Sequence, residues 1–429
     1  MIRGSNNFWG PSVQHGSAVR SQSVRETVSA AGGNVLVTAG QYHPDHPAGA
    51  NRLPYDEARF LAATGLEVWM LVQDILCTRR EYEVDGGVHV LRYQTPKLHV
   101  LDPRRMWAQR RAIAGTLSRH LPSVSAIHGH APLSYSAACA FYPAAHKVFS
   151  VHSPVTMEMA LNWSGGSWLD STRRLVGLPL LKRLERQCLD RSDAVSVDSG
   201  YTRSLLEKIH GPGVTANIKV IPGWVALDGF DAGQSKAAAR RQLGWPDDVP
   251  VLFTLRRLVG RMGLDILLRA TARLRNAGWN FRLMIGGDGP LCPLLKKTAA
   301  ALDLDGCAHF LGRVEDTTLP LMYSACDAFV LPTAALECFG LIAIEALAAG
   351  RPVLATPVGA IPEILLQVEP RWLARSARED DLVSLLADFL SGNLPIHEPS
   401  ELRGLVEREY LRESVIPQLT ALLFADQNA

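Results

Sequence analysis

The sequence predicts an α/β protein made of two Rossmann-like, doubly wound domains that face each other across a cleft. Three observations lead to this expectation: the length of 429 residues, short apolar runs that alternate with helical patterns, and one interruption of that alternation near mid-chain. The length exceeds one compact core and suits two domains of about 200 residues each. Apolar strands followed by helices predict parallel sheets that are covered on both faces.

The first domain is expected over residues 34–222. Residues 1–33 are polar, rich in Gly and Ser and without periodicity, so they predict a flexible arm outside the fold. Apolar runs predict strands at 35–39, 66–72, 88–93, 126–128, 147–151, 194–197 and 218–221. Helical patterns between them predict helices at 55–64, 133–141, 180–189 and 202–209.

The second domain is expected over residues 223–407, after a Pro-Gly break at 221–223. Strands are predicted at 251–255, 281–285, 309–311, 328–331 and 353–355, with helices at 264–275, 291–302 and 341–349. A final helix within 408–429 is expected to return to the first domain and complete it. Ligands of open parallel sheets bind at the carboxyl ends of the strands, so two facing sheets predict one shared site.

The composition excludes several classes of protein. The 44 Lys and Arg residues and 42 Asp and Glu residues leave a formal charge of only +2, so no global field favours nucleic acid. The seven cysteines form no C-x-x-C pair, which favours reduced thiols in a cytoplasm. The sequence contains neither an apolar run of about 20 residues nor a signal-peptide core, so we expect a cytoplasmic protein that does not span a membrane.

The densest motif runs from residue 331 to 350. A strand is predicted to end at its start, and a helix is predicted from Leu341 until Gly350 caps it. Gly340 precedes this helix. The free N–H groups of Leu341 and Ile342, together with the helix dipole, predict an anion site suited to a diphosphate.

Charged side chains accompany this motif. Glu337 precedes the helix, where it could accept hydrogen bonds from sugar hydroxyls, and Glu345 lies further along, where it could bind a ribose diol. From spacing alone, a purely structural interpretation is equally good: Glu337 would be an ordinary loop residue and Glu345 a solvated residue of the helix. Arg257 and Arg261 follow the first strand of the second domain, and guanidinium groups suit phosphate oxygens.

A glycine-rich loop follows the next strand. Gly287-Asp288-Gly289 lacks the third glycine of G-x-G-x-x-G, so a dinucleotide fingerprint is not supported. This argues against an NAD-dependent oxidoreductase.

Taken together, these residues resemble the retaining glycosyltransferases of family 4, whose fold is called GT-B. The resemblance rests on the R-R-L segment at 256–258, G-G-D-G-P at 286–290, F-L-G-R-V at 310–314, the E-x7-E pair and the segment 352–363. It implies that Glu337 contacts the donor sugar, that Glu345 contacts the ribose, and that Val314 meets the base through its backbone. The remaining donor-binding residues of this domain would be Gly287, Phe339, Gly340, Leu341 and Ile342.

The first domain resembles the family more loosely. Gly49 is similar to the glycine that approaches the donor phosphate and the acceptor, and His152 to the histidine that hydrogen-bonds the donor sugar. His130 and Glu158 are expected to face the acceptor.

One departure from the family pattern lies in the second domain. Met262 stands where the family has a Lys beside Gly263, and we expect Arg261 to take over the contact with the leaving diphosphate.

The expected function is retaining sugar transfer from a nucleoside diphosphate sugar to a small-molecule or glycan acceptor, that is, a hexosyltransferase-type enzyme. UDP is the preferred carrier and GDP the second choice. The expected catalytic residues are His152, Glu337, Arg257 and Arg261, with front-face attack and no covalent nucleophile. A catalytically impaired nucleotide-binding regulator with the same fold is the alternative, because the family Lys is missing.

No metal or other obligatory cofactor is expected. The histidines in 43–46 and 128–130 lack a third partner at zinc-site spacing, and Asp303-Leu304-Asp305 is expected to form a surface turn. The basic stretch 103–113 favours a solvated helix over membrane contact, and the oligomeric state stays open.

Overall fold

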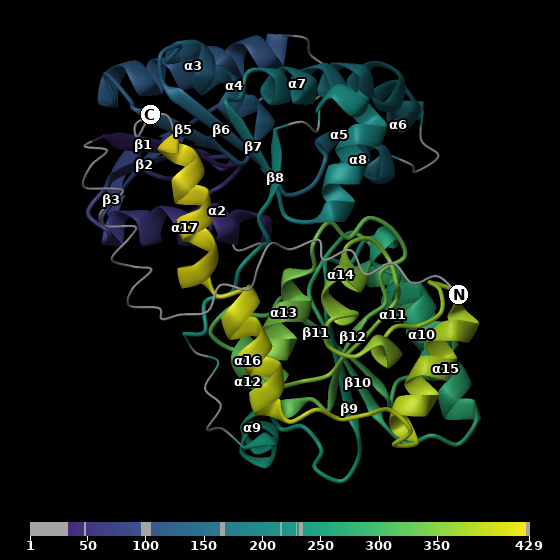
Figure 1. Cartoon of the computed structure of the whole chain (residues 1–429). Coiled ribbons are helices and arrows are strands. Elements are labelled where there is room, and N and C mark those ends of the chain that lie inside the picture. Colours follow the sequence, from purple (N-terminus) through teal and green to yellow (C-terminus); the bar gives the residue numbers. More distant parts are fainter. Residues whose placement is uncertain are drawn as a thin grey trace.

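The computed structural model describes residues 33–46, 49–95, 104–163, 168–214, 217–228, 230 and 235–425. They form two α/β domains, the first above the second in Figure 1. The first sheet has eight strands in the order β3-β4-β2-β1-β5-β6-β7-β8, and only the β3–β4 pair is antiparallel. The strands are β1 Asn34–Thr38, β2 Glu67–Gln73, β3 Tyr82–Asp85, β4 Val88–Tyr93, β5 Ala126–Gly129, β6 His146–Val151, β7 Ala194–Val197 and β8 Ile218–Val220.

Helices cover both faces of this sheet because its central strands are largely apolar and almost entirely buried. α2 (Gly49–Ala63) packs on one face, whereas α3 (Arg104–His120), α4 (Pro132–Phe141) and α7 (Leu178–Asp190) pack on the other. The chain between β6 and α7 contains α5 (Val155–Asn162), α6 (Trp168–Thr172) and a π-helical turn, and α8 (Gly200–His210) precedes β8.

The second domain has a five-stranded parallel sheet in the order β11-β10-β9-β12-β13. Its strands are β9 Val251–Leu255, β10 Arg282–Gly286, β11 Ala308–Gly312, β12 Ala328–Leu331 and β13 Val353–Ala355. Its helices are α9 Lys236–Leu243, α10 Leu264–Asn276, α11 Cys292–Ala301, α12 Leu319–Ala325, α13 Leu341–Ala348, α14 Ile361–Leu365, α15 Glu379–Leu390 and α16 Pro399–Glu409.

The last helix, α17 (Arg412–Leu423), crosses from the second domain to the first (Figure 1). Its apolar side chains, Val415 and Leu419 among them, join the core that contains Val35 and Val148. The imidazole of His146 at the start of β6 also hydrogen-bonds the carbonyl of Leu422, with 2.9 Å between Nε2 and O. In packing terms, α17 therefore belongs to the core of the first domain.

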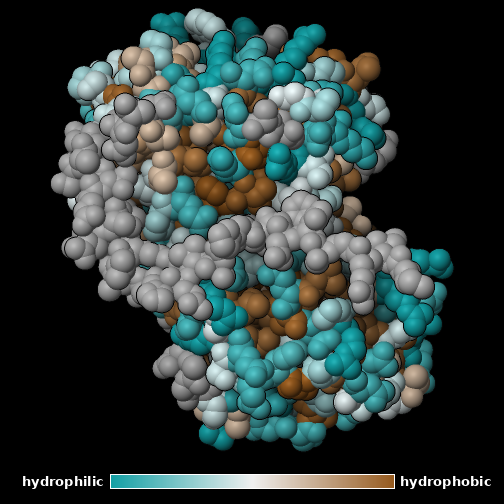
Figure 2. All heavy atoms as spheres, in the orientation of Figure 1, coloured by the Kyte–Doolittle hydropathy of each residue, from teal (hydrophilic) through white to brown (hydrophobic). Residues whose placement is uncertain are grey.

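A second set of contacts joins the domains face to face. The carboxylate of Glu363 in α14 accepts hydrogen bonds from the backbone N–H groups of Gly200 (2.9 Å) and Tyr201 (2.7 Å), which begin α8. The hydroxyls of Ser199 and Thr202 donate to the carbonyl of Cys338 in the second domain. Outside these contacts the surface is notched between the two domains, at the right of Figure 2.

The predicted fold class of two facing doubly wound domains is confirmed. Most strands begin and end within one or two residues of the predicted bounds. β3 was not predicted, because it is a short antiparallel edge strand whose side chains are all exposed or partly exposed, so it carries no apolar run. The turn at Asp303 and Asp305 is exposed, as predicted.

Glu363→Ala is expected to weaken the contact between the domains. The substitution leaves two backbone N–H groups at the start of α8 without their carboxylate, which costs about 1–2 kcal/mol for a helix cap. Urea unfolding followed by tryptophan fluorescence measures the change. Glu207→Ala, an exposed carboxylate on α8 itself, is the matched control; equal unfolding midpoints for the two variants would show that the cap contributes nothing.

Candidate active site

The loop between β12 and α13 is fixed on one side by the segment that follows β9. The backbone N–H groups of Ala334 and Ala335 both donate to the carbonyl of Arg261, at 2.9 and 3.1 Å. Gly263 has φ = 70°, and a Cβ there would lie 1.8 Å from the carbonyl oxygen of Pro332. Only glycine allows this approach, since any side chain would push the loop away.

The other side of the loop is fixed by the segment after β13. A Cβ on Gly359 would lie 2.0 Å from the carbonyl oxygen of Glu337, and Ala360 donates its N–H to the same oxygen at 2.8 Å. Between the two clamps Leu336 adopts φ = 56°, an unfavourable conformation for a branched side chain. The clamped backbone therefore sets the direction of the Glu337 side chain.

The carboxylate of Glu337 is paired with a buried arginine. Its Oε2 accepts from Nη2 of Arg256 at 2.6 Å and from the hydroxyl of Thr333 at 3.3 Å. Arg256 is 6% exposed, and its guanidinium also lies against the sulfur of Met262. Among the described residues nothing accepts a hydrogen bond from its Nε. This arginine was not among the predicted catalytic residues.

The two arginines that were predicted to meet the diphosphate have different surroundings. The side chain of Arg257 is exposed and forms no hydrogen bond or ion pair with the residues described. Arg261 donates from Nη1 to the carbonyl of Leu336 at 2.8 Å, and its Nη2 lies 3.8 Å from the carboxylate of Glu158 in the first domain. Arg261 thus holds the loop and reaches across the cleft toward Glu158, a predicted acceptor residue.

Glu345 is buried in α13 and pairs with the first domain. Its Oε1 accepts from Nη1 of Arg52 in α2 at 3.0 Å, and its Oε2 accepts from the hydroxyl of Tyr323 at 2.9 Å. Burial raises the pKa of Glu345, and the charge of Arg52 opposes that shift. The predicted ribose contact would therefore have to share or displace these partners.

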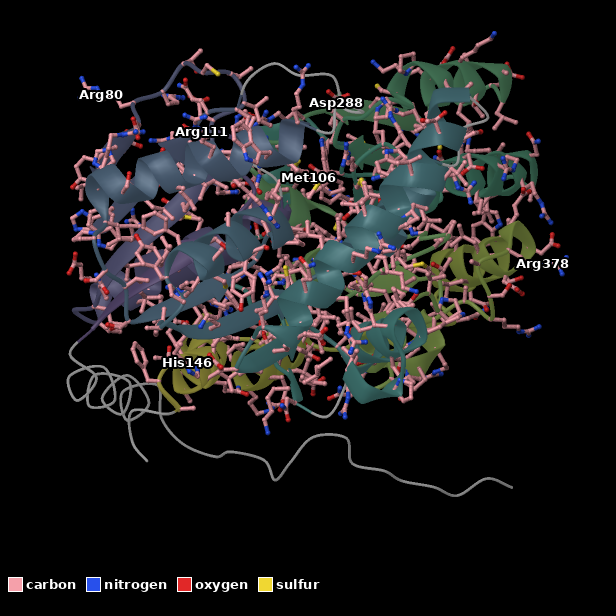
Figure 3. All side chains as sticks on the ribbon, turned by 90° about the horizontal axis from the view of Figure 1, so that it is seen from above. Arg80, Met106, Arg111, His146, Asp288 and Arg378 are labelled. Carbon is pink, nitrogen blue, oxygen red and sulfur yellow. The ribbon has the colours of Figure 1, made fainter. Side chains whose placement is uncertain are left out.

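The remaining predicted donor residues line the same end of the second sheet. Gly287 has φ = 110°, and a Cβ there would lie 1.9 Å from the carbonyl of Arg256, so its loop packs directly on the arginine segment. Its neighbour Asp288 is exposed on the side of the molecule away from α17 (Figure 3). Val314 packs beside Gly286.

The N-terminus of α13 has no side-chain cap. Gly340 has φ = 101° and leaves Leu341 and Ile342 as the first helical residues, without a side-chain cap. Phe339 packs on Gly223 at the domain connection. In the first domain Gly49 is the first residue of α2. Backbone N–H groups at the start of α13 thus suit an anion.

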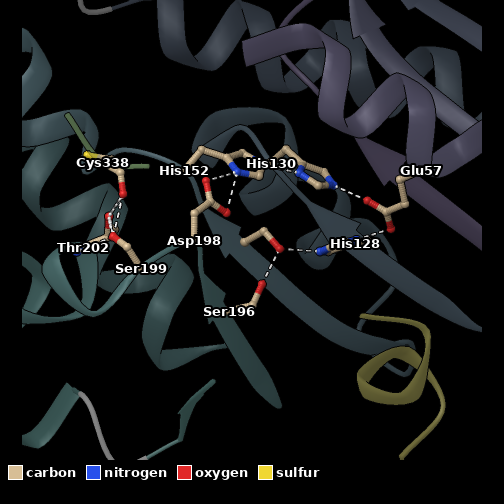
Figure 4. Close-up of polar contacts among 10 residues, drawn as sticks. Glu57, His128, His130, His152, Ser196, Asp198, Ser199, Thr202 and Cys338 are labelled. Atoms are coloured by element: carbon tan, nitrogen blue, oxygen red, sulfur yellow. Dashed lines mark hydrogen bonds and ion pairs between the residues drawn. The ribbon is translucent and has the colours of Figure 1, made fainter. Parts of the chain in front are cut away.

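Three histidines on and just after β5 and β6 take part in a chain of polar contacts in the first domain (Figure 4). His152 donates from Nδ1 to Asp198, with 2.8 Å to Oδ2, and its Nε2 lies 2.7 Å from Nδ1 of His130. The two rings stack, with 5.0 Å between their centroids. The side chain of His130 is only 2% exposed and packs on His152, so its expected contact with the acceptor stays a prediction.

The chain continues to Glu57, a fully buried carboxylate of α2. His130 Nε2 lies 2.9 Å from Glu57 Oε2, although the two atoms are not aligned for a hydrogen bond. His128 Nδ1 is 2.5 Å from Glu57 Oε1, and its Nε2 is 2.7 Å from the hydroxyl of Ser150. Neither Glu57 nor Asp198 was predicted from the sequence, because nothing in the spacing relates α2 to the ends of β5, β6 and β7.

These contacts set the charge on each group. Burial, helped by the proximity of His128, lowers the pKa of His130 to about 3. Burial also disfavours the charged form of His152, but the charge of Asp198, its hydrogen bond and the charge of Glu57 outweigh burial and raise the pKa. For Glu57, burial is outweighed by its two imidazole partners, and the pKa falls well below its usual range. The neutral His130 is therefore able to accept a hydrogen bond from Nε2 of a protonated His152.

In the same cluster, Glu57 adds a third possible metal ligand to His128 and His130, which the sequence spacing did not reveal. Ligand atoms of Glu57, His128 and His130 lie within 4.8 Å of one another, a grouping that could hold a metal ion. Both nitrogens of His128 already have hydrogen-bond partners, and Glu57 serves two imidazoles. His43, from the other predicted pair, instead bonds Asp316 of the second domain, with 2.7 Å between Nε2 and Oδ2.

A cleft between two doubly wound domains, with a clamped carboxylate loop and an open helix start at the strand ends, is the arrangement of GT-B glycosyltransferases. Two family models match the chain: Glycosyltransferase Family 4 over residues 47–228 and Glycosyl transferases group 1 over residues 235–403. The chain belongs to the family 4 type of glycosyltransferases.

Curated relatives are similar over part of their length. A GDP-mannose-dependent alpha-(1-6)-phosphatidylinositol monomannoside mannosyltransferase of Mycolicibacterium smegmatis is 29% identical over 220 residues, which are 50% of this chain and 57% of that protein. A D-inositol 3-phosphate glycosyltransferase of Saccharomonospora viridis is 33% identical over 276 residues, 62% of this chain and 57% of that one. The chain thus spans less than two thirds of the length of these relatives.

Solved structures share the fold at low sequence identity. Sucrose-phosphate synthase from Thermosynechococcus elongatus has a TM-score of 0.75 at 21% identity, covering 92% of this chain and 100% of that one. Anabaena HepE in complex with UDP and glucose has a TM-score of 0.70 at 16% identity, covering 92% and 99%.

Within the described residues no helix is both long and apolar enough to cross a membrane.

Stability is expected to fall on acidification below about pH 6.5 because of His130. Its pKa of about 3 means that the folded state stays neutral there while the unfolded state takes up a proton. One such proton changes the free energy of unfolding by about 1.4 kcal/mol per pH unit. Urea unfolding between pH 5 and 6.5 measures this slope, and His130→Asn should reduce it by roughly that amount.

His152 is expected to change the free energy of unfolding in the opposite direction, at pH values above about 6.5. Its pKa is raised, so its contribution to stability is present below about pH 6.5 and is lost as the pH rises through the raised value. The two histidines therefore act in separate pH windows. Parallel profiles for wild type and His130→Asn between pH 5 and 6.5 would contradict the assignment of a neutral His130.

Proposed function

We propose that the protein transfers a hexosyl group from a nucleoside diphosphate sugar to an acceptor nucleophile with retention of configuration. The observation that carries this proposal is the loop that presents Glu337. Its carboxylate is fixed beside a buried guanidinium at 2.6 Å, three residues before Gly340 opens α13. One place thus combines groups for both parts of a donor. The carboxylate suits sugar hydroxyls, and the guanidinium and the helix dipole suit a diphosphate.

The proposed reaction needs no covalent enzyme intermediate. The bond between the sugar C1 and the diphosphate oxygen breaks while the acceptor bonds to C1 on the same face. The acceptor proton passes to the departing diphosphate oxygen, and the start of α13 together with the arginine segment 256–261 stabilises the charge that develops there. Contacts such as Arg261 with Glu158 bring the domains together and exclude water from this site.

The carrier is proposed to be UDP, with GDP as the second candidate. The mycobacterial relative is named for GDP-mannose, whereas HepE is bound to UDP. The contact proposed for the base is the backbone of Val314, which either base accepts. The acceptor is proposed to be a small molecule or a glycan, and the reaction is proposed to require no metal.

A thermal-shift panel of nucleoside diphosphates and nucleotide sugars, followed by assay of nucleoside diphosphate release, tests the proposal. We expect UDP or GDP and the matching sugar to raise the melting temperature, and release to be unchanged in excess EDTA. Activity that is lost in EDTA and restored by manganese would contradict metal independence. Nucleotide binding without any turnover would favour the alternative of a nucleotide-binding regulator.

Glu345→Gln is expected to weaken donor binding by about tenfold or more, while Glu337→Gln mainly lowers turnover, because one carboxylate is assigned to the ribose and the other to the transferred sugar. Titration calorimetry and initial rates separate the two effects. Arg52→Gln breaks the ion pair of Glu345 without removing the carboxylate. If Arg52→Gln weakens donor binding as much as Glu345→Gln, the domain contact and not the ribose explains the loss.

A further inference from the structure

Arg256 is the buried cation nearest to the carboxylate that is assigned to the donor sugar. It follows β9 directly, and its N–H donates to the carbonyl of Gly286 at 3.0 Å, so its backbone is held between two strand ends. The guanidinium is not a solvated group, because the residue is only 6% exposed. A buried arginine is normally paired on all sides, yet its Nε has no acceptor among the described residues.

The neighbour of this guanidinium is the residue that departs from the family pattern. Met262 is 8% exposed, and its sulfur lies against Nη2 of Arg256. The side chain at the position of the family lysine is thus apolar here and is in contact with an arginine from the neighbouring strand end.

The two other arginines of the segment do not occupy this place. Arg257 is exposed, and Arg261 is held by the carbonyl of Leu336. The guanidinium of Arg256 is held by Glu337, whose side chain lies beside Gly340: a Cβ on Gly340 would be 3.9 Å from Cγ of Glu337. Arg256 therefore lies beside the start of α13, where the helix dipole also attracts an anion.

We propose that Arg256 contacts the diphosphate of the donor and fills the role that the family gives to a lysine at position 262. This inference rests on the proposed function. In the empty site Glu337 neutralises Arg256. When a donor is bound, the unused N–H of Arg256 meets a phosphate oxygen, and Glu337 remains able to accept from a sugar hydroxyl. The donor site is thus built with its cation and its carboxylate already paired.

The test compares nucleoside diphosphates with monophosphates by titration calorimetry, using UDP with UMP and GDP with GMP. Arg256→Gln is expected to weaken binding of the diphosphate at least tenfold while the monophosphate changes less than twofold, because only the β-phosphate is lost as a partner. Met262→Lys in the Arg256→Gln background is expected to recover part of the loss. Arg241→Gln, on the exposed face of α9, is the matched control.

Arg256→Lys keeps a positive partner for Glu337 and decides the question if Arg256→Gln does not fold. Its single ammonium is expected to give an intermediate loss of preference for diphosphate over monophosphate. Equal losses for both nucleotides, or unchanged diphosphate binding, would overturn the inference and assign Arg256 only to positioning Glu337. If the wild-type protein binds none of the four nucleotides, the proposed function itself fails.

Discussion

The clamping of one backbone segment, residues 332–340, is the constraint on which the rest of the site depends. Gly263 presses on Pro332 from one side and Gly359 presses on Glu337 from the other, each at a distance that excludes a side chain. Between them Leu336 is held at positive φ, a conformation that persists only where its surroundings impose it. Both glycines belong to segments that follow other strands, so the geometry of the whole sheet converges on the position of one carboxylate.

Around this loop, buried charges occur in pairs. Glu337 pairs with Arg256, Glu345 with Arg52, and His152 with Asp198. Removing a charge from water is costly unless a partner and further hydrogen bonds compensate for it, so in each pair the opposite partner offsets part of the cost of burial. Under the proposed function, a charged donor would meet groups that are already held in place. Such a site needs little rearrangement when the donor binds, which is the condition for electrostatic preorganisation.

The sequence predicted the two domains and the motif around Glu337, because apolar periodicity and glycines at strand ends are local signals. It did not predict Arg256, Glu57 or Arg52, whose partners lie on other strands or in the other domain. Of two adjacent arginines, one is buried and the other exposed, and a pattern of neighbours along the chain cannot tell them apart. The one available signal was the apolar Met262, which implied that a charge had to come from elsewhere.

The contacts between the domains differ in kind from those within them. The two chain crossings run side by side, where Val225 donates to Tyr410, Arg412 donates to Val225, and Val225 forms a parallel bridge with Leu411. Beyond these crossings the domains meet through polar groups, such as the carboxylate of Glu363 on α8, and through a small apolar cluster of Leu205, Leu336 and Cys338. Polar contacts can exchange with water at little net cost, whereas an apolar core cannot. Rotation about the paired crossings would therefore open the cleft while the core that contains α17 stays intact.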